Sequence, residues 1–103
     1  MGASRHRLLD DALDMSRRMA ELGDAGDWQA VIALEPERRT LLEKAFATHA
    51  PVDEFVTERV QAILELDKRL MAQSVQARDR IVQELGNSGR GRRAASAYHA
   101  AGG

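Results

Sequence analysis

Histidines and carboxylates are the residues of this chain that could act as metal ligands or as acids and bases. The histidines are His6, His49 and His99, and none has a second histidine at the spacing of a shared metal site. Cysteine does not occur, which excludes disulfides, thiol nucleophiles and cysteine-ligated zinc. We therefore expect solvated histidines, no metal and no cofactor.

The carboxylates are numerous, but their pattern is typical of solvated helix faces rather than of a catalytic pair. Asp24 and Asp27 lie close together, yet no calcium-binding loop follows them, so capping or turn roles explain them better. No glycine-rich loop joins a strand to a helix, because no segment has the alternating pattern of a strand. The sequence thus predicts that the protein is not an enzyme.

The composition is that of one small helical domain. The chain has 103 residues, of which 30% are charged and 44% are hydrophobic, and helix-forming residues are abundant. No apolar run approaches the ~20 residues of a membrane span. The N-terminus also lacks the apolar core of a signal peptide. We expect an all-α, cytoplasmic protein without membrane insertion.

Capping residues predict an antiparallel helical hairpin in the first half of the chain. Apolar residues recur at three- and four-residue steps after Ser4, a candidate N-cap. Gly26 should end this helix in a left-handed conformation, and Asp27 should cap the next one. Trp28 is expected to pack beneath the turn. Pro36 lies inside the second helix and predicts a kink, or less favourably a break.

The third predicted helix is the longest. It follows Pro51, which suits a first helical turn, and from Val52 to Leu85 the sequence has no glycine or proline. Its apolar residues alternate mostly between three- and four-residue steps, as in a coiled-coil seam, with Asp67 and Ser74 as polar interruptions. We expect one helix of about 35 residues. A break near Asp67 would instead give a closed four-helix bundle.

The helix lengths predict an uncovered apolar segment on the third helix. At ~1.5 Å per residue the first two helices span roughly 30 Å and the third roughly 50 Å. The hairpin should leave Ser74 to Leu85 uncovered, although this segment contains several apolar residues. The chain's own tail, a second copy or a partner helix could cover it. The predicted partner contacts are Val60, Ile63, Leu70, Ala77, Ile81 and Leu85.

The C-terminal segment differs from the rest of the chain in charge. Residues 1–88 hold 12 basic and 16 acidic side chains, a net charge of −4, whereas residues 89–103 are basic. We predict a helical bundle domain over 1–88 and a basic tail over 89–103. The turn-rich run Asn87–Gly91 predicts a break in the helix. A short helix at Arg92–Ala100 should follow and cover the apolar segment. Its predicted regulatory residues are Arg92, Arg93, Ala94, Ala95, Ala97 and Tyr98. Three tail arginines without interleaved aromatics do not indicate nucleic-acid binding.

Motifs near both ends resemble the FliT family of flagellar export chaperones. The first is Gly26-Asp27-Trp28, followed by Leu34-Glu35, Arg38-Arg39 and Leu41-Leu42. The second is the ending Gly91–Tyr98, which is similar to the family's tail, where a basic, small-residue segment closes on Ala-Tyr. The resemblance covers nearly the whole chain. Pro36 departs from the family's usual uninterrupted second helix.

The resemblance implies a cytoplasmic chaperone of type III flagellar export. FliT-like proteins bind the filament-cap protein FliD, guard its aggregation-prone helices against premature assembly, and deliver it to the export apparatus, at its ATPase or export gate. Some members also bind the flagellar master transcriptional regulator. In the family the last helix folds over the binding surface. Two alternatives stay open: a regulator that sequesters a transcriptional activator, and a structural subunit that forms a homodimer.

Overall fold

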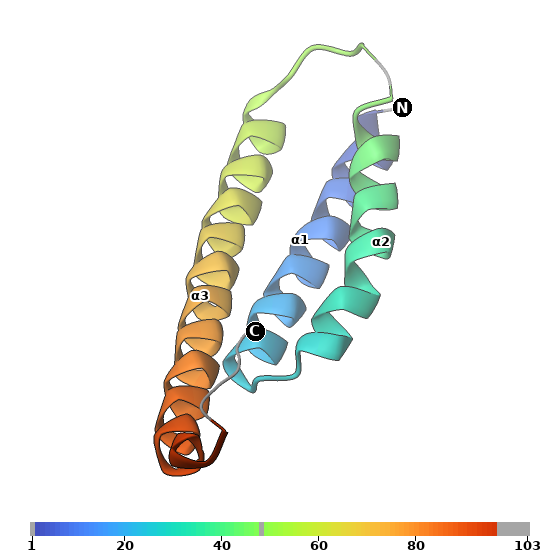
Figure 1. Cartoon of the computed structure of the whole chain (residues 1–103). Helices are drawn as coiled ribbons and strands as arrows, with labels where there is room; N and C mark the ends of the chain where they lie inside the picture. Colours follow the sequence, from blue (N-terminus) through green and yellow to red (C-terminus); the bar gives the residue numbers. More distant parts are fainter. Residues whose placement is uncertain (1, 48, 97–103) are drawn as a thin grey trace. The chain divides into compact units, whose positions relative to one another are not determined.

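The computed structural model describes residues 2–47 and 49–96, which form three α-helices and contain no strand (Figure 1). Helix α1 is Gly2–Asp24, α2 is Trp28–Ala45 and α3 is Glu54–Ser96. The predicted all-α class is thereby confirmed. The chain divides into two compact units, Met1–Gln73 and Ser74–Gly103, so α3 contributes to both.

The first unit is a small bundle in which α2 runs antiparallel to α1 and to the first part of α3 (Figure 1). The regular three- and four-residue spacing of aliphatic residues gives each helix one apolar face, and these faces meet in the core. Two clusters of buried side chains form this core: Leu9, Ala45 and Val56 in one, and Ala12, Leu13 and Ile63 in the other. Burial of their apolar surface is the main force that holds the helices together.

The turn between α1 and α2 forms as the sequence predicts. Gly26 has a φ of 78°, and its amide donates to the carbonyl of Gly23 at 3.1 Å. The amide of Asp27 donates to the carbonyl of Leu22 at 2.9 Å, which completes a Schellman motif. The Asp27 carboxylate accepts from the amide of Ala30 at 3.2 Å and caps α2.

Replacing Gly26 by alanine tests this turn. A non-glycine residue in the left-handed region costs roughly 1 kcal/mol, so Gly26→Ala should lower the free energy of unfolding by about that amount. Nothing lies within 4 Å of the added Cβ, so the cost is conformational. The control is Gly86→Ala, which also meets open space but lies inside α3, where alanine should be neutral or stabilising. Urea denaturation measures both variants, and a Gly26→Ala variant as stable as the native chain would contradict the motif.

Trp28 packs beneath the turn, as expected, at a point where the three helices approach closely. A Cβ added to the buried Gly23 would lie 3.2 Å from Cη2 of Trp28. The same Cβ would lie 2.9 Å from Cδ1 of Leu70 and 2.6 Å from Oε1 of Gln73. The absence of a side chain at Gly23 therefore lets α3 and Trp28 pack directly on α1.

Two helix starts differ from the prediction. Helix α1 begins at Gly2, so Ser4 lies inside the helix and is not its N-cap. Helix α3 begins directly after Asp53, and Pro51 precedes it in the loop. The reason is that the Asp53 carboxylate accepts from the amide of Val56 at 2.9 Å, which makes Asp53 the better cap.

Neither α2 nor α3 breaks where the sequence suggested a break. Helix α2 continues through Pro36, and α3 runs through Asp67 and across Asn87–Gly91 to Ser96. The described residues therefore form neither the four-helix bundle nor a separate helix starting at Arg92, and the rest of the expected tail helix lies outside them. An existing helix gains a hydrogen bond with each added residue, which offsets the low propensity of glycine, asparagine and serine.

Candidate functional site

The predicted contact stripe of α3 has a buried part in the first unit. Ile63 is buried and packs with Ala12 and Leu13, while Val60 packs on the neighbouring core cluster. Leu70 is half-buried against Gly23. These three stripe residues hold α3 to the other two helices, so a partner would contact them only after this packing had opened.

The remaining stripe residues lie in the second unit and are accessible. Ile81 and Leu85 expose 56% and 64% of their surface, and Ala77 is half-buried. Val75 and Val82 are exposed large apolar side chains of the same segment. Exposed apolar side chains gathered on one helix are typical of a protein-binding surface. We call these five residues the distal apolar segment.

The predicted regulatory residues lie at the end of α3 or beyond the described residues. The backbone of Arg92–Ala95 continues α3, whereas Ala97 and Tyr98 fall outside the described part of the chain. A continuous helix cannot fold back on itself, so α3 must break before the tail can shade the distal apolar segment. The three glycines between residues 86 and 91 each cost about 1 kcal/mol relative to alanine in a helix, so a break costs least there.

A buried arginine connects the three helices of the first unit. Nη1 of Arg38 donates to Oγ of Ser16 at 3.1 Å and to Oδ1 of Asp67 at 2.5 Å. Nη2 of Arg38 donates to the carboxylate oxygens of Glu35 at 3.3 and 3.1 Å. Ser16 donates in turn to the carbonyl of Ala12 at 2.9 Å. We call these residues the Arg38 network; the sequence pattern did not predict it.

The electrostatics of the Arg38 network indicate a structural part rather than an acid–base one. Burial by itself lowers the pKa of Arg38, because it penalises the cation. The hydrogen bond and charge of Asp67, followed by the charge and hydrogen bond of Glu35, outweigh this effect and raise the pKa above its usual value. The guanidinium thus stays protonated. Glu35 and Arg38 both belong to the motif between Leu34 and Leu42, so part of that motif serves helix packing.

Aromatic and charged side chains fix the start of α3. The ring of His6 stacks on Phe55 with centroids 4.0 Å apart, and its Nε2 lies 2.9 Å from Oδ2 of Asp53. The guanidinium of Arg59 lies 4.0 Å from the centroid of the Phe55 ring, and its Nε donates to Oδ1 of Asp10 at 2.7 Å. His6 is therefore half-buried and engaged, contrary to the solvated side chain we expected.

The other histidines do not complete a metal site in the described part of the chain. His49 is exposed in the loop before α3, and His99 lies outside the described residues. Over residues 2–47 and 49–96, no three histidine, aspartate or glutamate side chains gather as a metal site would require. Within the same ranges no helix is long and apolar enough to cross a membrane.

The cap of α3 should make stability depend on pH in acid. The hydrogen bond from the Val56 amide, followed by that from His6, holds the pKa of Asp53 below its usual value. The ionised Asp53 carboxylate stabilises the fold fully above the unfolded-state pKa of about 3.9. This stabilisation is lost as the pH falls through the lower folded-state pKa. Asp53→Asn keeps a capping oxygen without the charge.

Thermal melts at several pH values measure this effect. The Tm difference between the native chain and Asp53→Asn should shrink as the pH falls below about 4. Asp11→Asn, a change at an exposed carboxylate of α1, serves as the control for the loss of one acidic side chain. A difference that does not change with pH would contradict the cap.

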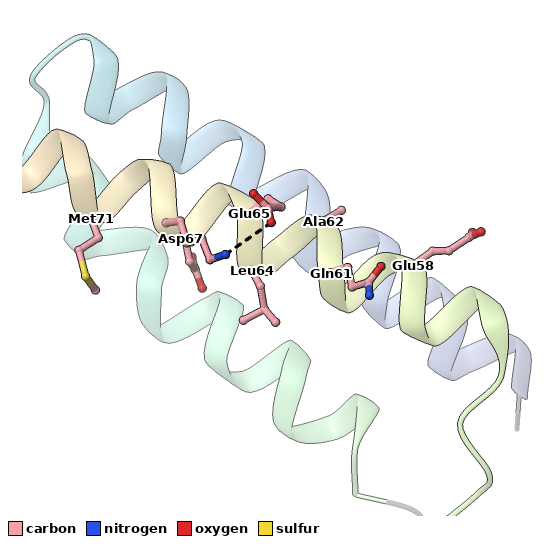
Figure 2. A pocket seen from close by; sticks show the side chains of 8 residues that line it. Glu58, Gln61, Ala62, Leu64, Glu65, Asp67 and Met71 are labelled. Atoms are coloured by element: carbon pink, nitrogen blue, oxygen red, sulfur yellow. Dashed lines mark ion pairs between the residues drawn. The ribbon is translucent and has the colours of Figure 1, made fainter.

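A second accessible apolar feature lies on α3 in the first unit. Leu64 and Met71 expose 53% and 70% of their surface and line an open hollow of about 780 Å³ (Figure 2). The other lining residues are Glu58, Gln61, Ala62, Glu65, Asp67 and Lys68. The predicted stripe did not include Leu64 and Met71, because they lie on a different side of α3 from Ile63 and Leu70.

The chain was compared with models of known families. The chain matches the family model described as "Flagellar protein FliT" over residues 6–100. This range includes both motifs noted in the sequence. No curated protein matches the chain. No solved structure matches it.

Proposed function

Since the chain belongs to the FliT family of flagellar proteins, we propose that it is a cytoplasmic chaperone of type III flagellar export. Its client is the filament-cap protein FliD, whose premature assembly it prevents. The observation that supports this proposal is the distal apolar segment. A chaperone needs an accessible apolar surface of this kind, because the client surface it must shield is also apolar.

The distal apolar segment can receive an amphipathic helix of the client. Full burial of an aliphatic side chain contributes roughly 1.5–3 kcal/mol, so Ile81 and Leu85 together can supply a large share of a micromolar affinity. Ala77, which precedes both residues on α3, has a small side chain that allows the client backbone to approach closely. Val60, Ile63 and Leu70 would join the contact only if the packing of the first unit opens.

We extend the proposal to regulation by the tail. Breaking α3 at its glycine-rich run would let Arg92–Tyr98 return over the distal apolar segment, where Ala94, Ala95, Ala97 and Tyr98 would replace the client. The same competition would set access of the export apparatus, through its ATPase or its gate. A chain that ends at Ser88 keeps the whole core of the first unit and should bind the client about tenfold more tightly. Calorimetric titration with FliD compares the two chains, and equal affinities would contradict the competition.

Binding to purified candidate partners tests the function itself. The tagged full chain should retain FliD from its own organism, and light scattering of the free chain should show no tight dimer. Retention of the flagellar master transcriptional regulator without FliD would replace the proposal by the regulatory alternative. A tight dimer that retains neither protein would instead identify a structural subunit.

A further inference from the structure

A side of α3 next to its core face carries, in the first unit, a regularly spaced surface that the proposed function does not use. Gln61, Leu64, Lys68 and Met71 follow one another at steps of three, four and three residues. This spacing is that of the a and d positions of a coiled coil, and it places Leu64 and Met71 both at d. Figure 2 shows the two side chains leaving α3 on the same side. We call these four residues the outer seam.

Acidic residues flank the outer seam. Glu58 and Glu65 are seven residues apart and occupy equivalent e positions beside it. Oε2 of Glu65 lies 3.7 Å from Nζ of Lys68. Oε1 of Glu58 lies 3.7 Å from Nη1 of Arg59, whose Nε already donates to Oδ1 of Asp10 at 2.7 Å. Exposed pairs at such distances contribute little, so both carboxylates remain available to a partner.

We propose that the outer seam docks an amphipathic helix of another protein, one that carries lysine or arginine beside its apolar stripe. The apolar stripe would cover Leu64 and Met71, and the basic residues would meet Glu58 and Glu65. The proposal rests on the first unit alone and does not depend on the client of the distal apolar segment.

A second copy of this chain fits the outer seam poorly. In an antiparallel pair the e positions face each other, which would oppose Glu58 and Glu65 to the same residues of the other copy. In a parallel pair Lys68 would face Lys68 at an a position. Like charges in these positions select against self-pairing and in favour of a partner of opposite flanking charge.

Two synthetic helical peptides test this inference. Both have leucine at the a and d positions; one has lysine at e and g, and the other has glutamate there. Fluorescence anisotropy at low ionic strength should show that the full chain binds the lysine peptide about tenfold or more tightly than the glutamate peptide. Equal binding of the two peptides, or none of either, would overturn the proposal.

Variants of the full chain assign the binding to the outer seam. Glu58→Lys combined with Glu65→Lys should reverse the peptide preference. Leu64→Asp combined with Met71→Asp should lower the affinity for the lysine peptide about tenfold or more. All four side chains lie on the surface of α3, so the melting temperatures should change little; if the aspartate pair lowers the melting temperature, Leu64→Gln combined with Met71→Gln is the milder substitution.

Controls separate the outer seam from other surfaces. Ile81→Asp combined with Leu85→Asp changes only the distal apolar segment and should leave peptide binding unchanged. If Ile81→Asp with Leu85→Asp abolished peptide binding while the outer-seam variants kept it, the proposal would be overturned. A dimer of the native chain that Leu64→Asp dissociates would assign the seam to a second copy. Much tighter peptide binding by the chain ending at Ser88 would assign it to the chain's own tail.

Discussion

The variant Arg38→Met should lose about 2–3 kcal/mol of its free energy of unfolding. Methionine fills a similar volume but cannot donate, so Asp67 and Glu35 lose their cation and Ser16 loses a hydrogen bond. The Arg38 side chain is 8% exposed, whereas those of Asp67 and Glu35 are 39% exposed. Water therefore compensates the two carboxylates in part, and the loss stays below that of a fully buried broken pair.

A double-mutant cycle identifies the cause of that loss. In Arg38→Met the Asp67 carboxylate has lost its cation, and replacing it by Asp67→Leu should restore part of the stability. The free energy of unfolding of the double variant should then lie within about 1 kcal/mol of that of the native chain. Arg39→Met changes an exposed arginine next to Arg38 and should cost less than about 0.5 kcal/mol. Urea denaturation followed by circular dichroism measures the native chain and all four variants. Strictly additive single effects would show that Arg38 and Asp67 are not coupled.

The second large effect concerns binding. Ile81→Asp combined with Leu85→Asp should weaken the affinity for FliD about a hundredfold or more, because two carboxylates would have to leave water in an apolar contact. The melting temperature should not change, since both side chains are exposed and neither belongs to the core clusters. Calorimetric titration gives the affinity, and a melt of the same sample confirms the fold.

A matched control separates apolar contact from charge. Gln76→Asp combined with Gln83→Asp adds the same two charges to exposed positions of the same helix. At 3.6 residues per turn these positions lie on the other side of α3 from Ile81 and Leu85. The control should change the affinity less than about threefold. An equal loss in both variants would mean that net charge, and not the distal apolar segment, governs the interaction.

Local capping chemistry was the most predictable part of the fold. Gly26 and Asp27 act within a few residues of themselves, so their types and order suffice to predict the turn, and Trp28 follows from them. Apolar spacing placed Ile63 on the stripe of α3, where we expected a partner contact, but in the fold Ile63 packs with Ala12 and Leu13. Ser4 was wrong as a cap because sequence alone does not show that helical residues precede it.

The parts that depend on contacts between helices were not predictable in the same way. Asp67 looked like an interruption of the apolar stripe, and only the fold reveals that Arg38 reaches it from α2. An acidic residue within a core stripe is the signal that could have indicated a buried cation. Leu64 and Met71 were not predicted, because the apolar spacing of α3 indicates a single stripe, whereas these two exposed residues lie on another side of the helix.

The continuity of α3 across Asn87–Gly91 shows a further limit of sequence patterns. Turn-forming residues predict a break when they are judged by themselves, but a helix that already extends to Leu85 needs no new nucleation to continue. The segment is thus a helix made of residues that favour helix weakly. Such a segment can serve as the hinge that tail regulation needs.

Amide hydrogen exchange of the chain with and without FliD tests the central claim most directly. Free, the distal apolar segment is a helix with exposed side chains, so its amides should exchange quickly compared with those of the first unit's core. In complex, peptides that cover Val75–Asn87 should become strongly protected, while the exposed side of α2 should exchange as before. Protection confined to other segments, or an unchanged pattern in the presence of saturating FliD, would contradict the account.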